Sequence, residues 1–165
     1  MGFLTDAFKT QQTNIKDSIL PVAAKNEIMA GRLPQINTDS LFIKKGEKCV
    51  YIDKAILNIH KKKTIKRYVG HSAPGLFKGT RVHVSRPIET EYEDTEQFKG
   101  ILYITTKRVV FQAAENAFDK QHRYLSAIVP YSNAVILQYG QKNYELIVSD
   151  GSVVYQALKL INESD

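Results

Sequence analysis

The stretch that decides the fold is Gly100–Phe111, "GILYITTKRVVF", in which two apolar runs flank a polar tip. Both runs are rich in β-branched and aromatic side chains, which suit a pleated and half-buried surface. We therefore predict an antiparallel hairpin. With a loop of two or of four residues, Ile104 falls opposite Val109 and Leu102 falls opposite Phe111, so one face of the hairpin is wholly apolar.

The other face of this hairpin is mixed in character. Tyr103 falls opposite Val110 there, while Thr105 and Arg108 fall at its end, near solvent. Single exposed charges are common and contribute little to stability. We therefore expect Arg108 to be an exposed cross-strand partner rather than a ligand-binding residue.

Short segments in which apolar and polar residues alternate lie on both sides of the hairpin and indicate further strands. In the C-terminal tail, Val154, Leu158 and Ile161 form one apolar stripe at helical spacing, with Asp150 or Ser152 as the N-cap. Roughly seven antiparallel strands followed by one helix predict a mainly β fold with flanking helices. We expect a partly open barrel with the C-terminal helix over one open end. The strands besides the hairpin are predicted in "CVYIDKAILNI", "RYLSAIVPYS", "AVILQYG" and "NYELIVSDG", and "LFKGTRVHV" and "TEYEDTEQ" border the others.

The first forty residues differ from the rest of the chain. The apolar positions Leu4, Phe8, Ile15 and Ile19 predict an amphipathic helix, and a second helix is expected around Pro21, ending near a Gly31 stop. The apolar stripe of the first helix has three possible packing partners: the domain itself, another subunit or a membrane surface. We divide the chain into a helical extension, residues 1–38, and a barrel domain, residues 39–165.

The hairpin, preceded by "KKGEKCVYIDKAIL" and followed by "NYELIVSDGSVVYQALKLI", resembles the bacterial pleckstrin-homology-like (PH-like) and GRAM-type domains. In these families a Gly precedes an apolar strand ending in Thr, followed by a short polar turn, an Arg and a second apolar strand ending in Phe. The resemblance covers about residues 41–162 and departs at Thr106, where the pattern often has Asn. It implies a seven-stranded, partly open barrel capped by a C-terminal helix. It also implies a non-enzymatic scaffold that binds lipid head groups, peptides or other subunits.

Composition is that of an ordinary globular protein, with 43% hydrophobic and 24% charged residues. The sequence contains no apolar run long enough for a transmembrane helix and no secretory signal at its start. The single Cys49 excludes an intramolecular disulfide and reads as a small buried residue at the start of a strand. We expect a cytoplasmic protein, with peripheral membrane attachment as the alternative.

Charge is spread unevenly along the chain, which carries a formal net charge of +6. A basic segment at residues 60–86 precedes an acidic block that begins at Glu89. In PH domains that bind phosphoinositides, the loop between the first two strands carries spaced basic residues, and this segment occupies a comparable place. We expect it to be a loop that binds phosphate or carboxylate groups; the alternative is a solvated loop whose charge the acidic block offsets. The candidate anion-binding residues are Lys61, Lys62, Lys63, Lys66, Arg67, Lys78, Arg81 and Arg86.

No catalytic or metal-binding motif is present, and the four histidines show no metal-ligand spacing. We therefore expect no enzyme, no catalytic residue, no metal and no cofactor. The leading hypothesis is a PH-like interaction module acting through protein–protein contacts, with a protein partner or self-association into a homo-oligomer. Anionic lipid bound by the basic loop is the first alternative. Nucleic acid is the second, disfavoured because Tyr68 is the one obvious stacking aromatic in that loop.

Overall fold

A computed structural model describes residues 14–74 and 81–164, with side chains described for 14–66 and 88–164. Contacts divide the chain into two compact units. One, the barrel unit, comprises the chain up to Ile59 together with the chain from Gln97 onward; the other, the ribbon, comprises His60–Glu96.

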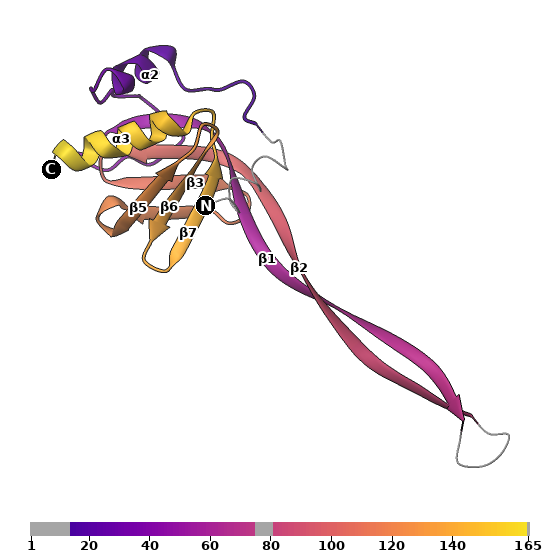
Figure 1. Cartoon of the computed structure of the whole chain (residues 1–165). Coiled ribbons are helices and arrows are strands. Elements are labelled where there is room, and N and C mark those ends of the chain that lie inside the picture. Colours follow the sequence, from indigo (N-terminus) through magenta and orange to yellow (C-terminus); the bar gives the residue numbers. More distant parts are fainter. Residues whose placement is uncertain (1–13, 75–80, 165) are drawn as a thin grey trace. The chain divides into compact units, whose positions relative to one another are not determined.

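The chain forms one seven-stranded antiparallel open sheet with a C-terminal helix and one short helix, as the sequence predicted (Figure 1). Hydrogen-bonded neighbours follow the order β4-β3-β2-β1-β7-β6-β5. The sheet therefore has β4 and β5 at its two edges, and its shape agrees with a partly open barrel. The elements in chain order are α2 (Val22–Met29), β1 (Cys49–Pro74), β2 (Arg81–Thr105), β3 (Arg108–Ala113), β4 (Phe118–Gln121), the 3₁₀ turn η1 (His122–Tyr124), β5 (Leu125–Pro130), β6 (Ala134–Tyr139), β7 (Lys142–Ile147) and α3 (Gly151–Ser164).

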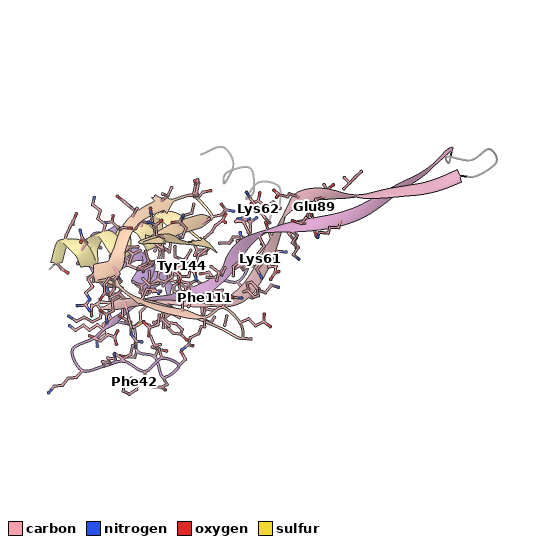
Figure 2. All side chains as sticks on the ribbon, turned by 90° about the horizontal axis from the view of Figure 1, so that it is seen from below. Phe42, Lys61, Lys62, Glu89, Phe111 and Tyr144 are labelled. Carbon is pink, nitrogen blue, oxygen red and sulfur yellow. The ribbon has the colours of Figure 1, made fainter. Side chains whose placement is uncertain are left out.

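The hairpin has the predicted register. Ile104 pairs with Val109 and Leu102 pairs with Phe111. All four side chains lie in the main hydrophobic core of the barrel unit, which the other strands and α3 complete. Phe111 and Tyr144 lie among these strands in Figure 2.

The second face of the hairpin is also buried, because the chain before β1 covers it. Leu41 packs with Cys49, Tyr103 and Val110 in a separate cluster. The hydroxyls of Ser40 and Tyr103 are 2.6 Å apart and hydrogen-bonded. The hairpin is therefore apolar on both sides, and Cys49 is the small buried residue expected at the start of a strand.

The predicted N-terminal helix over residues 2–20 is wrong where it can be examined: the described residues 14–20 are not helical, while Leu4 and Phe8 lie outside the described residues. Asp17 has a φ of 57° in the left-handed region, which a helix does not tolerate. The carboxylate of Asp53, which is fully buried, holds the segment instead. It accepts hydrogen bonds from Ser18 Oγ (2.6 Å) and from Ile19 N (2.8 Å).

The second predicted helix is confirmed as α2, which begins after Pro21. Gly31, at a φ of 90°, follows its end, in agreement with the predicted stop. Ala24 and Ile28 of α2 belong to the main core, and α2 contacts α3. The short helix therefore packs on its own domain.

Candidate functional site

Seven of the eight predicted anion-binding residues lie on strands, which corrects the expectation of a loop at residues 60–86. Lys61, Lys62, Lys63 and Lys66 lie on β1 within the ribbon. Strand β1 continues to Pro74 and β2 begins at Arg81, so regular pairing extends through most of the segment. The side chains of Arg67, Arg81 and Arg86 and all of Lys78 lie outside the described residues.

Acidic residues of β2 pair with three of these four lysines across the ribbon. Lys63 Nζ is 2.7 Å from Asp94 Oδ2, and Lys61 Nζ is 3.5 Å from Glu96 Oε1. The hydrogen bond raises the pKa of Lys63 and lowers that of Asp94, although both groups are exposed. The acidic block thus offsets basic charge in space, which was the alternative raised by the sequence.

The same pattern continues toward the tip, where Lys66 Nζ is 3.6 Å from Glu89 Oε1. Figure 2 shows Lys61, Lys62 and Glu89 along the two strands. Exposed ion pairs of this kind contribute little to stability. Their effect is to lower the positive charge that Lys61, Lys63 and Lys66 present to an anion.

The ion pairs also define the two faces of the ribbon. Lys61 and Lys63 meet even-numbered residues of β2, so odd positions of β1 share a face with even positions of β2. That face carries Ile65, Ile88 and Tyr92, whose exposed fractions are 43%, 41% and 42%. The opposite face carries Lys66 and Glu89 and has no exposed large apolar side chain among the described residues.

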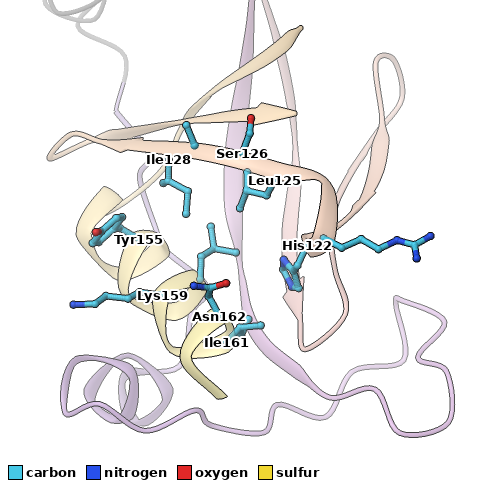
Figure 3. A pocket seen from close by; sticks show the side chains of 11 residues that line it. His122, Leu125, Ser126, Ile128, Tyr155, Lys159, Ile161 and Asn162 are labelled. Atoms are coloured by element: carbon cyan, nitrogen blue, oxygen red, sulfur yellow. The ribbon is translucent and has the colours of Figure 1, made fainter. Parts of the chain in front are cut away.

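A groove of about 430 Å³ lies between β5 and α3 in the barrel unit (Figure 3). Its lining combines apolar side chains from both elements with polar groups that include Ser126, Lys159 and Asn162, and with His122 and Arg123 of η1. Strand β5 bonds β6 on one side and is an edge of the sheet on the other. The groove therefore combines an apolar surface with an edge strand. Its apolar lining consists of Leu125, Ala127, Ile128, Leu158 and Ile161, with Tyr155 on α3.

Sequence reasoning missed this groove. The strand and the helix were each predicted, but the order of strands in the sheet was not, and only that order makes β5 an edge. The exposed aromatic Tyr155 on an otherwise amphipathic helix was the one available signal.

Arg108 is largely buried, which corrects the expectation of an exposed cross-strand partner. Its side chain is 12% exposed, and its Nε donates to Glu47 Oε2 at 2.9 Å. Its Nη1 donates to Asp119 Oδ2 at 2.6 Å, and its Nη2 donates to the Phe42 carbonyl. Thr105, expected near solvent, is fully buried and donates to Glu47 Oε2 at 2.5 Å.

This arrangement fixes the charge of Glu47. Burial raises the pKa of the Glu47 carboxyl, but hydrogen bonds from Arg108, Thr105 and the Lys44 backbone outweigh burial and lower it overall. The pKa of Arg108 is raised by its hydrogen bond to Glu47. A general acid or base needs a pKa near the working pH, whereas the hydrogen bonds to Glu47 keep it ionised. Its role is therefore structural: it joins the segment before β1 to the β2–β3 hairpin.

Across the described ranges 14–74 and 81–164, no cluster of His, Cys, Asp and Glu is suited to a metal ion. Within the same ranges no helix has both the length and the hydropathy to cross a bilayer. Neither protein-family models nor curated protein sequences gave a match to this chain.

Proposed function

We propose that this chain is a non-enzymatic interaction module of the PH-like class, and that it binds an extended segment of a partner protein in the groove between β5 and α3. The family proposal is supported by the "GILYITTKRVVF" hairpin, whose register places its apolar residues in the core. It is also supported by the seven-stranded sheet followed by a C-terminal helix.

The observation that carries the peptide-binding proposal is the edge position of β5 beside an apolar groove. An unpaired strand edge offers backbone donors and acceptors to an added strand, and pockets beside it select alternate side chains. The groove volume of about 430 Å³ suits a few side chains of such a segment. Ligands with alternating apolar residues are therefore expected.

A displayed library of random dodecapeptides tests this function. Enriched peptides should share alternating apolar residues, and their binding should protect backbone amides of residues 126–129 from hydrogen exchange. Tyr155→Ala removes a groove side chain and should weaken binding about tenfold. Tyr124→Ala is the matched control, because Tyr124 is an exposed tyrosine that does not line the groove. Enriched peptides that bind Tyr155→Ala as tightly as the wild type would exclude the groove.

Self-association through the ribbon is a second candidate, favoured by the apolar face at Ile65, Ile88 and Tyr92. An isolated two-stranded hairpin is marginally stable in water, so a second layer would stabilise it. Lys61 and Lys63 on this face are matched by Asp94 and Glu96. A second copy of this chain could therefore pack on the apolar face without net charge repulsion. We propose such a copy as the partner of the ribbon.

Sedimentation velocity of the full chain tests self-association. We expect a dimer that dissociates when the three apolar residues become threonine, a substitution that preserves strand propensity. The control exchanges Lys62 and Glu93 for threonine, which changes the opposite face without altering net charge. A monomeric wild type, or equal dissociation in the control, contradicts this candidate.

The two alternatives that use residues 60–86 as an anion site have less support. Lys61, Lys63 and Lys66 each face an acidic residue of β2. An anionic lipid or a nucleic acid would have to compete with these carboxylates. Both alternatives predict binding that is lost when Lys61, Lys62 and Lys63 are changed to glutamate, measured with anionic vesicles and with single-stranded nucleic acid.

A further inference from the structure

Three segments distant in sequence are hydrogen-bonded together in the barrel unit: the turn before β1, the β2–β3 turn and η1. Thr106 N donates to Lys48 O at 2.8 Å, which joins the first two segments. His122 N donates to Lys107 O at 3.1 Å, and His122 Nε2 donates to Thr105 O at 2.6 Å. Because a carbonyl only accepts, the His122 proton lies on Nε2.

A pocket of about 350 Å³ lies where these segments meet. Its lining includes Lys44 from the first segment, Lys107 from the second and Arg123 from the third. Backbone hydrogen bonds between the segments hold the three cationic residues around one cavity. No motif in the sequence joins them, since they come from three separate turns.

The acidic group in the lining does not cancel this charge. Glu47 has a side chain that is 1% exposed, and its oxygens already accept hydrogen bonds from Arg108, Thr105 and Lys44 N. Arg108 is shared between Glu47 and the exposed Asp119, so these three side chains together carry one net negative charge. The cations of Lys44, Lys107 and Arg123 in the lining outnumber it.

These three cations differ from the lysines of the ribbon. In the part of the chain for which side chains are described, none of the three forms an ion pair, whereas Lys63 and Lys61 do. Arg123 lies over the Tyr124 ring, with its guanidinium carbon 4.8 Å from the ring centroid, a contact that leaves its charge uncompensated. Like charges held together without a counter-ion are stabilised by binding an anion.

We propose that this pocket binds a phosphate group, carried either by a small molecule in solution or by a lipid head group. Two ammonium groups and one forked guanidinium match the several oxygens and double charge of a phosphate monoester better than a single carboxylate. The Gln121 side chain in the lining adds a neutral hydrogen-bonding group for the remainder of the ligand. This site lies outside residues 60–86. It adjoins the groove between β5 and α3, since His122 and Arg123 line both, whereas Lys44 and Lys107 line the pocket and not the groove.

Calorimetric titration of the full chain with inorganic pyrophosphate tests the site. Lys44→Gln, Lys107→Gln and Arg123→Gln should each weaken binding about five- to tenfold. Lys44, Lys107 and Arg123 are exposed, so these variants should fold. The double variant Lys61→Gln/Lys63→Gln removes charge from the ribbon and should bind as the wild type does. Equal losses in the pocket variants and in this control would mean general electrostatic attraction and would overturn the proposal.

Vesicles distinguish the two sources of phosphate. Binding to phosphatidylcholine vesicles that contain phosphatidylinositol phosphate, lost in the Lys107→Gln variant, would assign the phosphate to a lipid head group. Pyrophosphate binding without vesicle binding would assign it to a soluble ligand. Absence of binding to both probes at low and at physiological salt would overturn the proposal.

Discussion

Arg108 and Glu47, 61 positions apart in the sequence, meet through a 2.9 Å hydrogen bond from Nε to Oε2. The bond ties the start of β3 to the turn that precedes β1. The Glu47 side chain is 1% exposed, so its charge has almost no access to water if Arg108 is removed. Breaking such a pair from one side leaves an uncompensated buried charge.

Arg108→Gln should therefore destabilise the protein by about 3 to 5 kcal/mol, measured by urea unfolding. The double variant Arg108→Gln/Glu47→Gln removes both charges and should recover a large part of that loss. A loss below about 1 kcal/mol in the single variant would show that solvent reaches Glu47 and that the pair acts as a surface bridge.

Stability should fall in acid partly through Glu47. Its pKa in the folded protein lies below the ordinary value of 4.5, because donated hydrogen bonds outweigh the effect of burial. A group with a lowered folded pKa contributes its stabilisation fully above the unfolded pKa and loses it as pH falls through the folded value. The stability difference between the wild type and Glu47→Gln should shrink below pH 4.5. Urea unfolding at several pH values measures it; a difference independent of pH contradicts the assignment.

The thiol of Cys49 should be unreactive in the folded protein. Burial raises its pKa to about 11, and the residue is 2% exposed. At pH 8 about one thousandth of the thiol is ionised, and the thiolate is the reactive form. Ellman's reagent should react slowly in native buffer and stoichiometrically in guanidinium chloride. As the chain has one cysteine, the signal is unambiguous, and rapid reaction of the native protein would contradict this prediction.

Gly100 is required by close packing against β3. A Cβ atom there would clash with the Gln112 carbonyl oxygen and the Phe111 ring. Because the carbonyl belongs to a paired backbone, it cannot rotate away as a side chain does. Gly100→Ala should cost about 1 to 3 kcal/mol. The exposed neighbour supplies the control, as Lys99→Ala should leave the thermal midpoint nearly unchanged; equal midpoints for the two variants would refute the packing argument.

Ile28 tests whether α2 is part of the domain. It is fully buried in the main core, whereas the adjacent Met29 is 51% exposed. Ile28→Ala should cost about 2 to 5 kcal/mol, as truncation in a close-packed core does. Met29→Ala should change stability little. Similar small effects in both would mean that α2 is only loosely attached.

The hairpin register, strands β5 to β7 and α3 were predictable because their sequences carry regular apolar patterns. The four-residue β4 was not predicted, because Phe118 is its single apolar residue. The burial of Tyr103 was not predicted. Its face of the hairpin was expected to be mixed and partly solvated, yet Leu41 from the preceding segment covers it. The alternation of Leu41 and Ile43 carried a weak signal of this contact.

Other features left no local trace in the sequence. The described side chains of the ribbon, at residues 60–66 and 88–96, bury no core face. The sequence of residues 60–74 correspondingly lacks the apolar alternation that identifies a strand. Burial of Arg108 depends on a partner 61 positions away. The pocket at Lys44, Lys107 and Arg123 exists because backbone hydrogen bonds join three turns that are distant in the sequence, and no local sequence pattern indicates this.

Strands β1 and β2 each run without interruption from the barrel unit into the ribbon. Side chains alternate between the two faces of a strand. Ile65 is an even number of residues from Leu57, and Tyr92 is an even number from Leu102, and both leucines lie in the core. One residue inserted between Ile59 and His60 would turn the first strand of the ribbon over while leaving the core sequence intact. Which side chains lie on each face of the ribbon therefore depends on how many residues separate them from the core positions of the same strand.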